Sequence, residues 1–113
     1  MICRIWRGWT TPDNADAYER VVRGEVIPAI EARRIAGFRH IDLMRRELDA
    51  PAGGEVEFLT AMWFDDVESI KAFVDRDDAD HTVSHVPPAA RAVLARFDER
   101  SGHYEVLEDR PQT

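Results

Sequence analysis

The hydrophobic pattern at the start of the chain changes from strand-like to helical within a few residues. Residues Ile2–Trp9 are rich in β-forming side chains and predict a first strand. Thr11–Asp13 then combine a capping Thr, a Pro suited to the first helical turn and an acid, which is typical of a helix start. The apolar residues that follow at helical spacing are Ala15, Tyr18, Val22, Val26 and Ile30. Pro28 should kink this helix, and Gly37 should end the connection after it.

The rest of the chain predicts a hairpin, two more helices and a last strand. The expected elements are a strand at Phe38–Glu47, a strand at Glu55–Phe64, a helix from Asp65, a short helix from Pro87 and a strand at Gly102–Leu107. Residues 49–54, rich in Pro and Gly, should form the hairpin loop. The helix from Asp65 has an acidic cap with Glu68 three residues later. The short helix should bury Ala90, Val93, Leu94 and Phe97.

This order of elements predicts an α+β fold. The sequence β-α-β-β-α-β, with a short extra helix before the last strand, is the ferredoxin-like or split βαβ plan. The whole of it fits within residues 1–107 as a single domain, because a chain of 113 residues has room for one hydrophobic core. Residues 108–113 are expected to form a frayed tail.

The expected strands have apolar side chains on both faces. Alternate residues of a strand point to opposite sides, so parity separates the two sets. In the third strand one side carries Val56, Phe58, Met62 and Phe64, and the other carries Leu59, Ala61 and Trp63. In the first strand one side carries Ile2 and Trp6, and the other carries Cys3, Ile5 and Trp9. Two helices cover only one face of a four-stranded sheet, so the second apolar face needs another partner.

A second copy of the chain is the simplest partner for that face. A large uncovered apolar surface normally marks an interface, and a two-fold dimer with its sheets packed together removes it from water. The alternative is a monomer with a few exposed aromatic side chains. Parity leaves open whether Trp6 or Trp9 faces the partner.

Composition narrows the classes of partner and the location. A net charge of −7 argues against nucleic acid, whose binding depends on clustered Lys and Arg. Cys3 is the only cysteine, so no internal disulfide forms, and it is expected to be a small strand residue. The chain shows neither an apolar leader nor a run long enough to span a membrane. We therefore expect a cytoplasmic protein with no nucleic-acid or membrane partner.

Several segments resemble the antibiotic biosynthesis monooxygenase family of the dimeric α/β-barrel superfamily. The segment Trp63–Phe73 is similar to the family's strand-to-helix pattern, in which a tryptophan is followed by Ser or Asp and then by Glu and Phe. Further similar segments are Arg4–Pro12, Val86–Arg91, Arg96–Arg100 and His103–Val106. The resemblance implies a ferredoxin-like protomer, an obligate dimer with back-to-back sheets, and a pocket between each sheet and its own helices.

The resemblance also implies a function. Characterised members include oxygenases that act on aromatic polyketides without a cofactor, and haem-degrading enzymes. The leading hypothesis is a dimeric, cofactor-independent monooxygenase for an aromatic or apolar metabolite. The alternatives are a non-catalytic ligand-binding or regulatory dimer and a haem-binding or haem-degrading protein. Haem degradation is disfavoured, because the family's asparagine near Trp6 is missing and Phe73, Val74 and Asp75 stand where the haem-ligating histidine is expected.

The candidate catalytic residues are Trp63, His85, His81 and His40. Trp63 is carried over from the family motif and is expected to line the pocket, unless it is a core aromatic under the next helix. Either His81 or His85 is a possible base near neutral pH. His40, close to Asp42 along its strand, reaches a buried face or lies at the sheet edge or dimer interface.

The candidate substrate-binding residues are Trp6, Arg4 and Phe73. Arg4 is a charge within an apolar strand, suited either to stabilising a substrate enolate or to an ion pair across the interface. His81 and His85, four residues apart with Asp77, Asp78 and Asp80 nearby, raise the alternative of a metal site. β-Branched residues and Pro87 favour extended chain there, so we predict no metal site.

Overall fold

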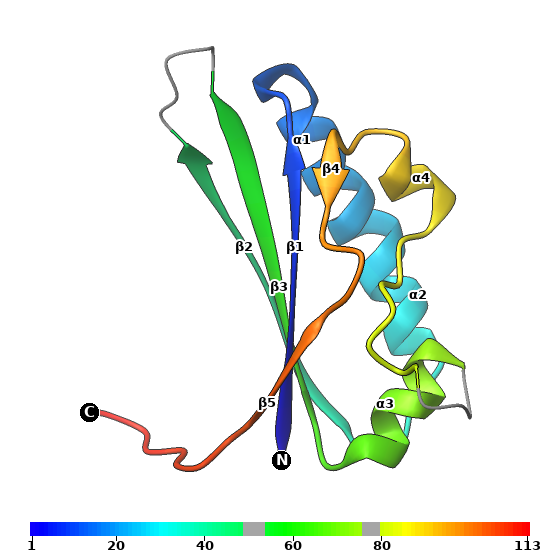
Figure 1. Ribbon diagram of the computed structural model, residues 1–113, viewed down its shortest axis with the longest axis vertical. Helices are drawn as coiled ribbons and strands as arrows, with labels where there is room; N and C mark the ends of the chain where they lie inside the picture. Colours follow the sequence, from blue (N-terminus) through cyan, green and yellow to red (C-terminus); the bar gives the residue numbers. More distant parts are fainter. Residues whose placement is uncertain (49–53, 76–79) are drawn as a thin grey trace.

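The computed structural model of the protein describes residues 1–48, 54–75 and 80–113. Its strands are β1 (Ile2–Thr10), β2 (Phe38–Leu48), β3 (Glu55–Phe64), β4 (Arg96–Phe97) and β5 (Gly102–Glu105). Its helices are α1 (Pro12–Val21), the π-helical segment η1 (Val22–Val26), α2 (Ile27–Ala32), α3 (Val67–Val74) and α4 (Pro88–Arg91). Figure 1 shows the helices on one side of a single twisted sheet. None of the helices in these ranges is long and apolar enough to cross a membrane.

The sheet is antiparallel and has the strand order expected of the split βαβ plan. β3 lies between β1 and β2, and the other edge of β1 pairs with β4 near one end and with β5 near the other. The last strand is thus divided into two short pieces that share one partner (Figure 1). The prediction of an α+β, ferredoxin-like fold is confirmed.

Strand register divides the sheet into an inner face under the helices and an open face on the other side. On β1 and β3 the even-numbered residues face inward. The register places Trp6 opposite Thr60 and Gly8 opposite Phe58, and paired residues point to the same side of a sheet. Phe58 belongs to the core beneath the helices, and Trp6 packs against it. One core cluster on this face contains Ala15, Tyr18, Val22, Val56, Phe58 and Ala90. A second cluster contains Ile30, Met62, Phe64, Ile70 and Phe73. The helices therefore pack on the face that carries Val56, Phe58, Met62 and Phe64, a choice that parity left open, and Trp6 rather than Trp9 lies beneath them.

A β-bulge at the start of β2 places Phe38 and His40 on opposite faces, although residues two apart in a regular strand share one face. Phe38 pairs with Phe64, but His40 pairs with Trp63, so one residue is inserted between the two pairs. As a result Phe38 packs against the inner core while His40 points to the open face. The option that His40 reaches the buried inner face with Phe38 is therefore wrong.

Pro28 disturbs the long first helix in a specific way. It has no N–H group to donate to the carbonyl four residues earlier. Immediately before it the chain forms η1, in which the N–H of Ile27 bonds to the carbonyl of Val22, five residues back. After α2 the chain turns at Gly37, whose φ of +86° favours glycine, and enters β2. The expected kink thus takes the form of a π-helical turn.

Three local expectations require correction. The cap of α3 is Asp66 rather than Asp65, and its capping-box partner is Ser69 rather than Glu68. Asp65 instead pairs with Arg39 at 2.5 Å. Thr11 stands at the start of α1, but its side chain makes no cap hydrogen bond.

The short last helix also differs from its expected extent. It ends at Arg91, and the next residues turn toward β1. Phe97 belongs to β4, where it pairs with Gly8, instead of lying on the helix. The expected hairpin loop lies largely in 49–53, outside the described residues, and β5 ends at Glu105 instead of Leu107.

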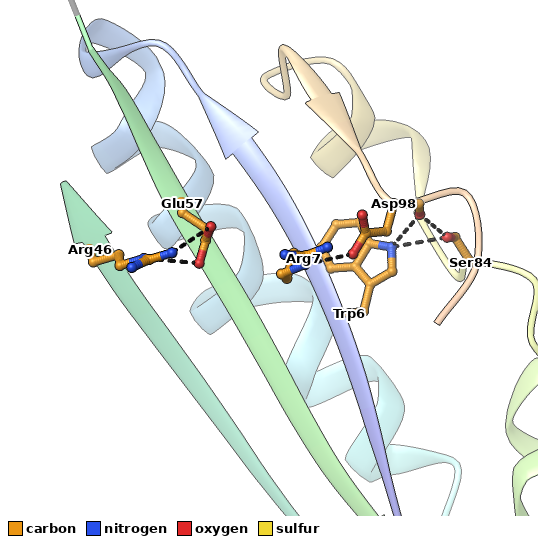
Figure 2. A network of polar contacts seen from close by, with 6 residues as sticks. All are labelled: Trp6, Arg7, Arg46, Glu57, Ser84 and Asp98. Carbon is orange, nitrogen blue, oxygen red and sulfur yellow. Dashed lines mark hydrogen bonds and ion pairs between the residues drawn. The ribbon is translucent and has the colours of Figure 1, made fainter. Parts of the chain in front are cut away.

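The open face carries apolar side chains that no helix in the described ranges covers. Ile5, Leu59 and Trp63 are partly exposed, and Met44 and Tyr104 are 49% and 62% exposed. Toward the other end of the sheet the face becomes charged. There Glu57, which is buried, accepts two hydrogen bonds from the guanidinium of Arg46, and Arg7 pairs with Asp98 (Figure 2). Trp9 on this face is buried beneath Arg7 and Arg96.

Candidate functional site

A pocket lies between the inner face of the sheet and the first helix, and residues 85–90 and Ser101 close its remaining side. Its cavity volume is about 50 Å³, within a wider hollow of about 560 Å³ that includes open solvent. Its apolar lining includes Trp6, Val22, Val26, Ile30, Met62 and Phe73. Its polar lining consists of Arg4, Tyr18, Thr60, His85 and Ser101. A mostly apolar hollow with a few convergent polar groups is the usual form of a small-molecule site. We call it the inner pocket.

Arg4 places a buried positive charge on the wall of the inner pocket. It lies on β1, and its side chain is 3% exposed. Its Nη1 donates to the carbonyl of His81 at 2.9 Å and to Nε2 of His103 at 2.9 Å, while Nη2 donates to the carbonyl of Val83 at 2.7 Å. The guanidinium also lies 5.5 Å from the ring centroid of Phe73. Burial lowers the pKa of Arg4 to about 10, so it remains charged near neutral pH.

Two histidines lie against Arg4 and form a layer behind the pocket wall. The rings of His81 and His103 stack with centroids 5.4 Å apart and planes 8° apart. Burial, together with the charges of Arg4 and His81, lowers the pKa of His103 to about 4. Nδ1 of His81 is buried and has no hydrogen-bond partner in the described part of the chain. His81 is therefore close to the site through its carbonyl, but it does not line the inner pocket.

Trp6 forms part of the pocket wall and is fixed by its indole N–H. Nε1 donates to Oγ of Ser84 at 2.9 Å and to the backbone carbonyl of Asp98 at 2.8 Å (Figure 2). The Ser84 hydroxyl donates to the same carbonyl. The side chain of Asp98 accepts from Nε of Arg7 at 3.0 Å. This network ties the segments around residues 84 and 98 to β1 and holds the Trp6 ring at the pocket.

His85 lies at the mouth of the inner pocket beside Phe73. The two ring centroids are 4.9 Å apart, and Phe73 itself is buried. His85 is exposed as a residue, but partial burial, followed by the positive charges of Arg33 and Arg4, lowers its pKa. Its imidazole is therefore neutral near pH 7 and can accept a proton. Arg33 donates to the carbonyls of Ala72 and Phe73 and so fixes the end of α3 that carries the Phe73 ring.

Three hydroxyl groups of the inner pocket were not among the residues predicted from the sequence. Tyr18 is 2% exposed, packs edge-on against Phe58 at 4.7 Å, and has a pKa raised by burial, so it is a neutral donor. Thr60 lies opposite Trp6 on β3. The hydroxyl of Ser101 is buried without a partner among the described residues. Of the three, only Tyr18 could have been found from the sequence, because its hydroxyl stands on an otherwise aliphatic helix face.

The structure brings together four of the seven candidate residues. Arg4, Trp6, Phe73 and His85 all line the inner pocket. Trp63 does not, because it lies on the open face opposite Cys3 and His40, 5.1 Å from the His40 ring. His40 in turn contacts Asp42 at 3.1 Å on that face. The expectation that the pocket lies beside Trp63 is therefore wrong.

The segment with His81 and His85 is a turn followed by extended chain, so the two imidazoles do not share a helix face. Within residues 1–48, 54–75 and 80–113 no three His, Cys, Asp or Glu side chains gather as they would around a metal ion. Asp77 and Asp78, two of the oxygen ligands considered above, lie outside the described residues.

Comparison with known proteins places the fold. No protein-family model and no curated protein sequence matches the chain. Among solved structures, a proposed antibiotic biosynthesis monooxygenase from Bacillus cereus has a TM-score of 0.64 at 13% identity, over 98% of this chain and 97% of that one. An ethyl tert-butyl ether D (EthD) family protein from Bacillus halodurans has a TM-score of 0.55 at 16% identity, over 95% and 100%. The chain therefore has the fold of antibiotic biosynthesis monooxygenase-like proteins.

Proposed function

We propose that the protein is a homodimeric, cofactor-independent monooxygenase that oxidises an aromatic or apolar metabolite in the inner pocket. The observation that carries this proposal is the composition of the pocket. Apolar walls from the sheet and helices surround a neutral imidazole, a buried cation and three hydroxyl groups. These are the groups needed to bind an apolar ring, remove a proton and stabilise the resulting anion.

The reaction we propose converts a methylene group beside a conjugated system into a carbonyl. A base removes one C–H proton, and the carbanion, delocalised as an enolate, gives its electrons to O2. The peroxide that forms then loses water, so CH2 and O2 become C=O and H2O. Electrons come from the substrate itself, and the protein supplies position, a base and charge stabilisation.

Four pocket residues have roles in that scheme. His85 is the proposed base, in preference to His81 and His40, because its ring alone among these three lines the pocket. Arg4 stabilises the enolate oxygen with its positive charge. The rings of Trp6 and Phe73 form walls against which an aromatic substrate packs.

The open face supports the proposed dimer. Helices cover the inner face alone in the described part of the chain (Figure 1). On the other face, Ile5, Leu59 and Trp63 remain partly exposed. A second copy placed sheet to sheet buries these side chains and the exposed Met44. A two-fold axis brings the same surface from both protomers together.

The enzyme hypothesis is tested by oxygen uptake with a panel of anthrone-type and related apolar substrates. Faster uptake than in buffer, lost when His85 is replaced by Gln, is the expected result. A protein that binds members of the panel but consumes no oxygen is instead a ligand-binding or regulatory dimer. Failure of every substrate to consume oxygen faster than buffer rejects the oxygenase.

One observation favours haem as a second candidate ligand. His85 offers a neutral imidazole at the mouth of an apolar pocket, which is the form in which histidine binds haem iron. If this is the ligand, added hemin shows a shifted Soret band at one haem per protomer, and the shift disappears in a His85→Ala variant. An unshifted spectrum removes haem from consideration.

A further inference from the structure

Arg4 differs from the exposed, ion-paired arginines of the described residues in how its charge is compensated. Exposed arginines such as Arg7, Arg39 and Arg96 each lie within 3.0 Å of a carboxylate oxygen. Arg4 is 3% exposed, yet its described contacts are two backbone carbonyls, the neutral His103 ring and the face of Phe73. No Asp or Glu among the described residues pairs with it.

A buried cation without a counter-charge is unfavourable unless something else supplies the negative charge. Buried charged groups in proteins are normally paired, because moving an unpaired charge out of water costs several times more free energy than a neutral hydrogen bond contributes. The chain has 22 Asp and Glu residues, so acidic side chains are abundant. The buried guanidinium nevertheless lies on the wall of the inner pocket and not in a closed core.

Some hydrogen-bond donors on this wall also lack partners among the described residues. A guanidinium has five N–H groups, and three of those on Arg4 are used by His81, Val83 and His103. The N–H of Nε and one N–H of Nη2 have no partner in the described part of the chain. Ser101, which is 6% exposed, lines the same pocket and has a buried hydroxyl that likewise lacks a described partner. β5 carries His103 opposite Arg4, and Ser101 directly precedes this strand.

We infer that the molecule bound in the inner pocket is an apolar acid, whose anionic oxygen pairs with Arg4 and accepts a hydrogen bond from Ser101. This deepens the proposed function, and it rests on the inner pocket being the ligand site. A carboxylate matches the paired N–H groups of a guanidinium, while the remainder of the molecule lies against Trp6 and Phe73. The metabolite therefore carries an ionised group before any reaction begins, and in this form of the proposal Arg4 holds that group instead of the enolate oxygen formed during turnover.

The experiment compares acids with their neutral amides in calorimetric titrations without oxygen near neutral pH. Suitable pairs are benzoate with benzamide, naphthoate with naphthamide, and anthracene carboxylate with its carboxamide. Each pair has the same apolar body and differs mainly in charge. At least one acid should bind about tenfold or more tightly than its amide, since a charge-assisted hydrogen bond replaces a neutral one. If no acid in the series binds more tightly than its amide, the inference is wrong.

Variants locate the effect. Arg4→Gln should weaken binding of the acid by roughly 30-fold or more and weaken the amide much less, so that the preference for the acid is lost. Arg39→Gln removes an exposed positive charge paired with Asp65, and it should change neither affinity. Ser101→Ala should weaken the acid by roughly fivefold and the amide by less, because the hydroxyl bonds more strongly to a charged acceptor. An Arg4→Gln protein that is folded by circular dichroism and keeps the preference for the acid contradicts the inference.

Two further outcomes are also informative. Should Arg4→Gln not fold, because residues 81–83 lose their anchor, Ser101→Ala and the acid-to-amide ratio of the wild type decide the question. Oxygen uptake plays no part in these titrations. An acid that binds through Arg4 but is not oxidised upholds the anion site and rejects only the monooxygenase. Oxidation of a substrate that binds independently of Arg4 upholds the monooxygenase and rejects the anion site.

Discussion

The guanidinium of Arg4 donates a 2.9 Å hydrogen bond to Nε2 of His103 across the β1–β5 pair. A guanidinium has no acceptor, so Nε2 must be the acceptor and the ring proton lies on Nδ1. Protonating His103 would remove this bond and place a second positive charge beside the first. The contact therefore holds His103 in its neutral form, in agreement with a pKa lowered to about 4 by burial and by the charges of Arg4 and His81.

This relationship predicts how stability depends on pH. Unfolded histidine has a pKa of about 6.5. Between pH 6.5 and about 4 the unfolded chain binds a proton at His103 that the native protein does not, so the free energy of unfolding falls as pH falls through this window. A His103→Gln variant, which keeps an acceptor for Arg4, should lose less stability between those two pH values than the wild type. Urea unfolding near pH 7 and near pH 5 measures the difference, and equal losses contradict the assignment.

The lowered pKa of His85 predicts a pH profile for turnover. As the proposed base it must be neutral, so kcat/KM should fall on the acid side through a pKa below 6.5. His85→Gln should lower kcat by about 10² to 10⁴, the usual contribution of a general base. His40→Gln is the comparison, because it removes an imidazole from the open face. An NMR titration of His85 with a midpoint above 6.5, or equal loss of activity in both variants, would exclude this role.

Gly37 should be the glycine least tolerant of substitution near α3. Its φ is +86°, and a Cβ there would lie 2.6 Å from Oγ of Ser69, which forms the capping box with Asp66. Gly37→Ala should therefore lower the free energy of unfolding by about 1–3 kcal/mol. Gly24→Ala, in the helical segment η1, is the matched control, because a Cβ at Gly24 meets nothing within 4 Å. This change should raise the free energy of unfolding by about 0.5–1 kcal/mol. Urea denaturation distinguishes the two variants, and an unchanged free energy of unfolding in Gly37→Ala would refute the expected strain.

Much of the fold was predictable because strand parity is a local property. Val56, Phe58, Met62 and Phe64 share the inner face as their alternation predicts. Parity alone does not say which face the helices cover, so it left Trp6 and Trp9 unplaced. It also fails at a bulge, and the extra residue between Phe38 and His40 reversed the side to which His40 points.

The site was predictable only in part, because it depends on contacts between distant segments. Arg4 and Trp6 stood out as a charge and a large aromatic within an apolar strand. Trp63 was placed by a motif that locates the end of a strand without specifying its face. The Ser101 hydroxyl reaches the pocket through the pairing of β5 with β1, about a hundred residues apart in the chain, and nothing in its local sequence indicates this.

The proposed dimer predicts a change in mass on a single substitution. Leu59 lies at the centre of the open face, opposite Arg7 and Met44, so Leu59→Arg places charge in the proposed interface. The wild type should have twice the protomer mass at micromolar concentration by light scattering, and Leu59→Arg should be monomeric. Ala32→Arg, an exposed position at the end of α2, should leave the mass unchanged. A monomeric wild type would contradict the dimer.

The most direct test compares oxygen uptake by the Trp6→Phe and Trp63→Phe variants on any substrate from the anthrone-type panel that the wild type oxidises. Trp6 lines the inner pocket and is fixed by Ser84, so Trp6→Phe should lower the rate by about tenfold or more. Trp63 lies on the open face, so Trp63→Phe should retain a rate within about twofold of the wild type. A wild type that oxidises no substrate, or a pair in which Trp63→Phe abolishes turnover and Trp6→Phe spares it, would contradict the inner pocket as an oxygenase site.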